Sequence, residues 1–238
     1  MDAMTLDQLP GFRRRLRITP APACVRSEVE DDFHRMAVTI HHQDGIATSI
    51  EPHMQRAPWS TCPGAVAQLR WTFEGVALKD FAERGEKRSN CTHLHDLATL
   101  AAAHARDAQP LTYDILVSDP SDGRRDTQLR RDGAIVLHWT LADRSLVQPA
   151  ELAGMTLDKL GPWIAAQAPA VQEAARLLRW GTMIANGRAI PLAQQSDASR
   201  MPVGNCYTFQ PDTRLRAERI VDIRDFSTGT LEPLGEKA

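Results

Sequence analysis

The chain has 238 residues, of which 42% are hydrophobic, so it is long enough and apolar enough to bury a substantial core. Its 28 lysines and arginines against 30 aspartates and glutamates give a formal charge of −2, and this balance argues against nucleic acid as a partner. The sequence has neither an apolar run of membrane-spanning length nor a signal-peptide core, so we expect no membrane partner and a cytoplasmic location.

The first third of the chain, from Phe12 to Met54, has a strand-like pattern. The basic run 13–17 alternates with apolar residues, which predicts an edge strand with a solvated face. Residues 35–42 and 46–51 alternate on either side of an Asp-Gly pair, Asp44-Gly45, and this arrangement is typical of a β-hairpin.

Four carboxylates in residues 28–32 lead into Phe33 and His34. Runs of charge are usually solvated, and that is the default interpretation. The alternative is that Asp31 or Asp32 faces a cleft and pairs with His34 or with an arginine.

Three stretches have helical spacing, and one central region has strand spacing. Helices are predicted over 63–71, 92–105 and 170–187, the last with Gly187 as its C-cap. Residues 111–147 hold two further Asp-Gly turns between alternating runs, which predicts an antiparallel meander.

These elements predict a single α+β domain over residues 1–238. Its antiparallel sheet would consist of an N-terminal hairpin and a central meander, packed with several helices, and we expect flexible ends at 1–11 and about 227–238. The sequence holds no glycine-rich phosphate loop and no strand–helix alternation, so no nucleotide cofactor is expected.

Two short segments, 56–64 and 90–97, contain most of the chemically reactive side chains. Each precedes or begins a predicted helix, where free N–H groups and the helix dipole favour negative charge. Each also offers a thiol and a hydroxyl, and the second adds two imidazoles and a carboxylate. This combination favours a small-molecule site.

The second segment predicts acid–base chemistry. His93 can take a proton from a hydroxyl, with Asp96 one turn away to orient its ring, and the helix start would keep the ring neutral and basic. The competing interpretation is that Thr92 or Asn90 caps the helix and that the histidines are ordinary, partly exposed residues.

A metal site is a further possibility, because Cys91 and His95 lie four residues apart on one helix face. His93 points the other way, so an ion would need Cys62, Cys206 or another histidine brought in by the fold. No Cys-x-x-Cys pair occurs, which removes the strongest sequence signal for structural zinc. We therefore predict no metal ligands and no cofactor.

The first segment has two interpretations as well. Arg56 can clamp an anion or a phenolate and Trp59 can stack on an aromatic ring, but Trp59 equally suits a core position. Cys62 would need a partner base to act as a nucleophile, so we predict a small packed thiol. Near the C-terminus, Tyr207 and Gln210 offer a phenol and an amide.

Six segments of the chain form a recognisable pattern: 30–34, 58–64, 91–94, 131–133, 187–188 and 206–211. In these segments the chain resembles the bacterial domain-of-unknown-function family 2889, and the resemblance spans roughly Phe12 to Phe226. His95 departs from the family's pattern, where an apolar or aromatic residue is expected, and this departure weakens a metal site built on His93 and His95.

The resemblance implies an enzyme of aromatic-compound catabolism. The reaction would be a cofactor-independent lyase step that releases a hydroxymethyl group as formaldehyde from a lignin-derived dimer and leaves a stilbene. In this scheme His93 is the base, oriented by Asp96, Arg56 or Tyr207 holds the phenolate, and Trp59 is the stacking wall. The other residues expected at the substrate are Thr61, Thr92, His34 and Gln210.

Two alternatives belong to other classes of protein. One is a metal- or thiol-dependent ester or thioester hydrolase built on Cys62, Cys91 and the histidines. The other is a non-catalytic small-molecule binder or assembly subunit. The expected partner is a small aromatic molecule, and self-association into a homo-oligomer is left open.

Overall fold

The computed structural model describes residues 5–190, 196–220 and 222–235. Within these residues the strands form an eight-stranded antiparallel sheet in the order β4-β3-β2-β1-β5-β6-β7-β8. The fold is therefore α+β, as the sequence predicts. The strands are β1 (Gly11–Ala21), β2 (Cys24–Asp31), β3 (Arg35–Gln43), β4 (Ile46–Arg56), β5 (Leu111–Ser118), β6 (Arg124–Arg131), β7 (Ala134–Ala142) and β8 (Ser145–Gln148). The α-helices are α1 (Ala65–Phe73), α2 (Thr92–Ala103), α3 (Gly161–Ala165), α4 (Pro169–Ala185) and α5 (Pro211–Arg214).

The chain divides into two compact units. The first unit comprises Met1–Arg15, Thr112–Ile190 and Asp225–Ala238, and the second comprises Leu16–Leu111 and Pro191–Arg224. The single domain expected from the sequence stays a prediction. Residues 1–4 and 236–238 of the expected flexible ends lie outside the described residues.

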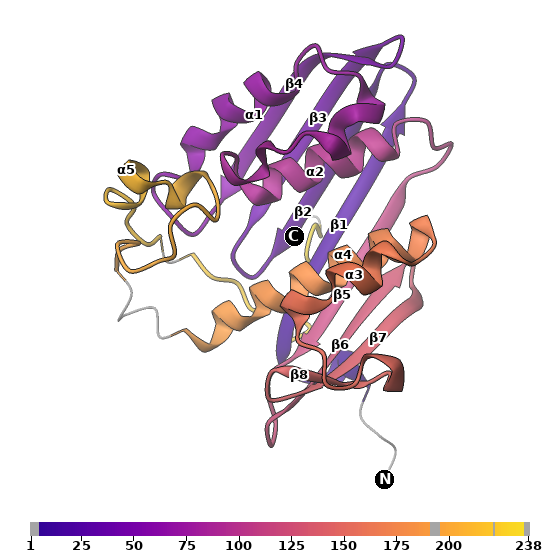
Figure 1. The fold of residues 1–238 in the computed structure, drawn as a ribbon, viewed down its shortest axis with the longest axis vertical. Coiled ribbons are helices and arrows are strands. Elements are labelled where there is room, and N and C mark those ends of the chain that lie inside the picture. The colour runs from indigo at the N-terminus through magenta and orange to yellow at the C-terminus, as the bar shows by residue number, and fades with distance from the viewer. Residues whose placement is uncertain (1–4, 191–195, 221, 236–238) are drawn as a thin grey trace. The chain divides into compact units, whose positions relative to one another are not determined.

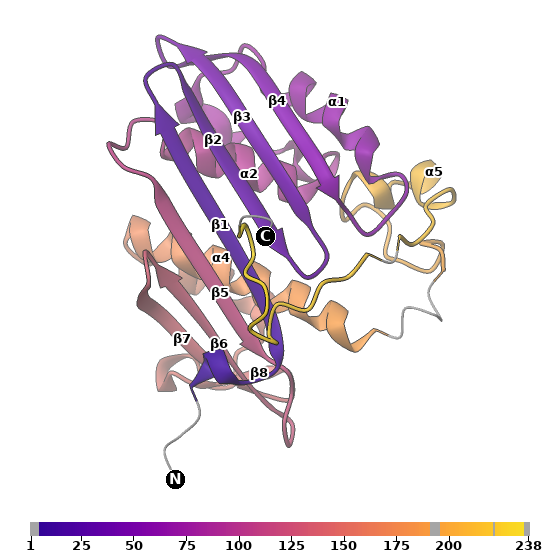
Figure 2. The ribbon, with the colours of Figure 1, turned by 180° about the vertical axis from the view of Figure 1, so that it is seen from behind.

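In the second unit, two helices cover one face of the strands β2, β3 and β4. Helix α2 packs on β2 and β3, and helix α1 packs on β4. Figures 1 and 2 show both helices on the same side of these strands. The apolar stripe of α2 supplies this contact, since Leu94, Leu97 and Ala98 are almost fully buried.

The hairpin predicted between residues 35 and 51 is confirmed as β3 and β4. Ile40 lies opposite Ile50 in the register, and the turn at Asp44 and Gly45 has φ angles of 53° and 78°. Positive φ at both central residues gives the twist that a two-residue hairpin needs, which explains the Asp-Gly pair.

In the first unit, β5, β6 and β7 form the predicted meander. Asp132 and Gly133 make the turn between β6 and β7 with φ angles of 49° and 82°. Helix α4 covers one face of β6 and β7 (Figure 1). It also approaches β5 closely, because a Cβ placed at Gly181 would lie 2.8 Å from Cγ2 of Ile115.

The structure corrects the prediction for the basic run 13–17. Strand β1 lies inside the sheet rather than at its edge, and Arg13 and Arg14 are buried. The guanidinium of Arg13 donates to the main-chain oxygens of Leu6 and Leu9, at 2.9 and 2.6 Å. Backbone acceptors therefore take the place of the expected solvent.

The C-cap predicted at Gly187 is also wrong. Helix α4 ends at Ala185 with Asn186 as its C-cap, and the chain continues into a 3-10 turn over Asn186–Ala189. This tightening satisfies terminal carbonyls without a left-handed glycine. In the described part of the chain, no helix combines the length and the apolar character needed to span a membrane.

Candidate functional site

The site is centred on the turn that joins β2 to β3. The carboxylate of Asp31 accepts the backbone N–H groups of Phe33 and His34, each at 2.8 Å, and the N–H of Asp31 donates to the oxygen of His34 at 2.9 Å. A short side chain that accepts backbone N–H groups two and three residues ahead closes a tight turn. Asp31 is fully buried, so the turn is held by a carboxylate that lies inside the protein.

The same carboxylate holds the ring of His34. The distance from Nδ1 of His34 to Oδ1 of Asp31 is 2.9 Å, and the histidine is 6% exposed. A carboxylate that accepts from Nδ1 fixes the ring's orientation and tautomer and leaves Nε2 as the basic nitrogen. Asp31 therefore shapes the backbone and one imidazole at once.

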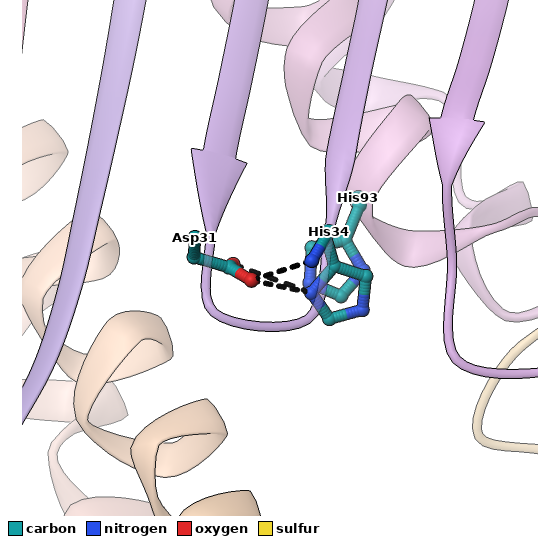
Figure 3. Close-up of side chains that lie close together, drawn as sticks. All are labelled: Asp31, His34 and His93. Carbon is teal, nitrogen blue, oxygen red and sulfur yellow. Dashed lines mark hydrogen bonds and ion pairs between the residues drawn. The ribbon is translucent and has the colours of Figure 1, made fainter. Parts of the chain in front are cut away.

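A second imidazole lies on the first. The ring of His93, from the first turn of α2, stacks on the ring of His34 with centroids 3.9 Å apart and planes inclined by 29°. Figure 3 shows the Asp31 carboxylate directed toward the two rings, which come from the β2–β3 turn and from α2. His93 is partly exposed, so it is the more accessible of the two imidazoles.

The start of α2 differs from the capping interpretation. Its N-cap is Cys91, which makes no side-chain cap, and Thr92 is already the first helical residue. Asn90 is fully buried and donates instead to Thr72 and to the main chain of Glu86. The side chains of Thr92 and Asn90 therefore do not cap the helix that holds His93.

Three of the four carboxylates in the acidic run are buried rather than solvated, which corrects the default interpretation for these three. Glu30, Asp31 and Asp32 are at most 1% exposed. The pairing of Asp31 with His34 in the alternative interpretation is confirmed, whereas a cleft at Asp31 stays a prediction. Buried carboxylates need partners, and the carboxylate of Glu30 lies within 3.4 Å of three arginines. These arginines are Arg35, Arg56 and Arg224.

Arg56 is the innermost of the three. Its guanidinium donates to the main-chain oxygens of Asp32 at 2.6 Å and Asp31 at 2.8 Å, and to Glu30 at 3.0 Å. The side chain is only 3% exposed. Through these contacts Arg56 stabilises the β2–β3 turn from inside the protein. Few of its guanidinium N–H groups then remain to bind a phenolate.

The carboxylate expected to orient His93 has another partner. Asp96 forms an ion pair with Lys87 at 2.6 Å. The carboxylate that the structure places at the imidazole pair is Asp31, which the site residues chosen from sequence did not include. Its position between two predicted strands, three residues before His34, is the signal that marks it as a turn residue.

The two reactive segments lie against a common third segment. The N–H of Tyr207 donates to the oxygen of Asn90 at 2.9 Å, and Sγ of Cys62 lies 3.3 Å from Oγ1 of Thr208. Thr61 also contacts Thr208, at 3.4 Å. Residues 206–209 therefore join both segments, while their lining of one cavity stays a prediction.

Several expected substrate contacts are engaged with the protein itself. Trp59 is 4% exposed, packs edge-on against Phe209 and lies beneath the guanidinium of Arg219 at 4.4 Å. Gln210 donates to the main-chain oxygens of Arg88 and Cys206. These contacts favour the core interpretation of Trp59 over a stacking wall.

The thiols are poor nucleophiles. Burial raises the pKa of Cys62 to about 11 and that of Cys91 to about 12, so both remain protonated near neutral pH. Cys62 is 8% exposed, which confirms the predicted packed thiol.

His95 lies on the buried side of α2, away from His93. Its ring is tilted on that of Phe73 with centroids 5.0 Å apart, and burial lowers the pKa of its imidazole. The separation of His93 and His95 on the helix is as the sequence predicts.

The structure brings together a different set of potential metal ligands from the Cys91 and His95 pair that the sequence analysis considered. Among the residues that it describes, one group of three such side chains has ligand atoms within 4.8 Å of one another: Asp31, His34 and His93.

Comparison of the chain with protein-family models gives no match, and comparison with curated proteins gives none either.

Proposed function

We propose that this chain is a lyase that acts on an aromatic dimer and releases a hydroxymethyl group as formaldehyde, leaving a stilbene. The resemblance to family 2889 suggests the reaction class. The observation that best supports a catalytic role is the stacked imidazole pair of His34 and His93 beside the buried carboxylate of Asp31.

The reaction needs one proton removed and one returned. A base takes the O–H proton of the hydroxymethyl group, the O–H electron pair forms the C=O bond of formaldehyde, and the C–C bond breaks. Its electrons form the C=C bond of the stilbene, while an oxygen on the neighbouring carbon leaves with its own bonding pair and takes up a proton. Electrons balance without an oxidant or reductant, so proton transfer is the protein's main task.

The imidazole pair suits that task. His93 is the more exposed of the two residues and is assigned to take the proton, and Asp31 holds the neighbouring ring of His34 in one orientation. The two rings, with centroids 3.9 Å apart, form one acid–base unit beside Asp31. The proton that this unit accepts is returned to the leaving oxygen, and the pair is then ready for the next turnover.

A thiol-dependent hydrolase is less well supported. Such an enzyme needs a thiolate, and burial holds the pKa values of Cys62 and Cys91 at about 11 and 12. Neither thiol belongs to the cluster of Asp31, His34 and His93.

The test uses matched pairs of 1,2-diaryl dimers, one with the hydroxymethyl group and one in which hydrogen replaces it. Formaldehyde is measured by derivatisation and the stilbene by its absorbance. We expect the two products in equal amounts, and only from the dimer with the hydroxymethyl group. Binding of both dimers without turnover would instead identify a non-catalytic binder and contradict the proposal.

A further inference from the structure

The geometry points to a divalent metal site in the same cluster: we propose that Asp31, His34 and His93 bind a transition-metal ion such as Zn²⁺, and that the ion inhibits the enzyme. The binding half of this proposal is independent of the proposed function. The inhibition half depends on it, because an ion on the ring nitrogens removes the base.

The ligand types fit zinc. Two imidazole nitrogens and one carboxylate oxygen form a common three-residue zinc set, which leaves a fourth position for water. Zinc lies about 2.0–2.2 Å from such ligands, so two ligands of one ion are separated by roughly 4 Å or less. The three atoms already lie within 4.8 Å of one another, which is close to the spacing that one ion requires.

The carboxylate of Asp31 is held in place by groups outside the ligand set. It accepts the backbone N–H groups of Phe33 and His34, and the ion would replace the proton between this carboxylate and Nδ1 of His34. Hydrogen bonds that orient the ligands raise the affinity of a metal site, because less ordering remains to be done on binding. The β2–β3 turn therefore supplies a rigid half-site.

His93 supplies the movable ligand. An ion lies close to the plane of each ring that binds it, so two rings inclined by only 29° have to open before both can bind one ion. His34 is buried, whereas His93 is partly exposed at the first turn of α2 and can turn about its side-chain bonds. Metal binding is therefore expected to separate the stacked rings.

The competing zinc ligands in this unit are less suitable. Cys62 and Cys91 are buried, at 8% exposure each, and neither belongs to the cluster of Asp31, His34 and His93. Cys206 is partly exposed and serves as a control for adventitious thiol binding. His53 is an exposed histidine on β4 and serves as the matched imidazole control.

The experiment titrates chelator-treated protein with Zn²⁺ alone in a calorimeter. We expect the parent protein to bind one ion per chain. Affinity should fall by at least about 10–100-fold in His34→Ala, His93→Ala and Asp31→Asn, because losing a residue that only orients a metal ligand already costs that much. Asp31→Asn keeps an oxygen for the backbone N–H groups of the turn, so it removes the charge while preserving the local fold. His53→Ala and Cys206→Ser should bind as the parent protein does.

Equal binding by His93→Ala and the parent, or loss of binding in Cys206→Ser, would overturn the site. Inhibition is tested separately, by adding Zn²⁺ to the formaldehyde assay of the parent protein. We expect turnover to fall as the site fills, and an increase would overturn the inhibitory role. Because binding is measured without substrate, failure of the lyase proposal would leave the binding result standing, and the reverse also holds.

Discussion

Asp31 has three functions at the residue scale: it closes the β2–β3 turn, orients His34, and places negative charge beside the imidazole pair. A buried carboxylate with so many partners is costly to bury but stable once paired. Its neighbour Glu30 is paired with arginines from three separate parts of the chain. The chemistry of the site therefore depends on a buried charge network beneath it.

Arg56 is predicted to stabilise the fold rather than to bind substrate. Replacing it with alanine should lower the free energy of unfolding by about 3–5 kcal/mol, because it breaks a buried ion pair and leaves main-chain oxygens unpaired. Arg56→Lys should recover part of this loss, since lysine keeps the charge without the planar donor geometry. Chemical denaturation measures both. If the Arg56 variants kept the parental stability and had a raised KM, Arg56 would instead bind the phenolate of the substrate. Arg216→Lys, at an exposed arginine, is the control.

His95 is predicted to make the stability of the fold depend on pH. Burial lowers the pKa of its imidazole below the ordinary value of 6.5, so the unfolded chain takes up this proton at a higher pH than the folded chain does. The contribution of neutral His95 to the free energy of unfolding is therefore complete above about pH 6.5. It is lost as the pH falls from about 6.5 through the lower pKa of the folded state. In denaturation curves across this window, His95→Leu should show a smaller loss of stability than the parent. If the free energy of unfolding fell equally with pH in both proteins, His95 would not contribute to the pH dependence.

At the scale of elements, the contact of α4 with β5 sets a size limit at Gly181. Alanine normally stabilises a helix interior by about 1 kcal/mol relative to glycine. At Gly181, however, a Cβ would lie 2.8 Å from the side chain of Ile115, and overpacking of this kind costs roughly 1–3 kcal/mol. We expect Gly181→Ala to lower the melting temperature.

The matched control is Gly161→Ala at the start of α3, where an added Cβ meets nothing within 4 Å. That variant should be neutral or slightly stabilising. A melting temperature for Gly181→Ala at or above that of the control would mean that α4 and β5 are less closely packed than described.

Local signals predicted the elements well, and long-range contacts explain what they missed. The β3–β4 hairpin and the meander followed from Asp-Gly turns, because two adjacent residues fix the turn geometry. The position of β1 inside the sheet depends on strand order, which no local pattern encodes. The burial of Glu30 likewise depends on Arg56 and Arg224, which are distant in sequence. His93 was identified from its place at a helix start, whereas its stacking on His34 required the fold.

At the scale of the whole molecule, a proton-transfer mechanism predicts independence from added metal. Protein treated with a chelator and then freed of it should keep its rate of formaldehyde release, because the proposed chemistry requires no Lewis acid. The rate is compared before treatment, after treatment and after addition of Zn²⁺. Activity lost to the chelator and restored by the ion would establish a metal-dependent enzyme and end the proton-transfer scheme.

The central claim is that the imidazole pair on Asp31 transfers the protons of the reaction. The most direct measurement is the rate of formaldehyde release by His93→Ala and Asp31→Asn, with His53→Ala as the exposed-histidine control and circular dichroism to verify folding. We predict that His93→Ala loses about 10²-fold or more in kcat, the usual scale for removing a general base, and that Asp31→Asn also loses activity while the control does not. A folded His93→Ala protein with a near-parental rate would contradict the account.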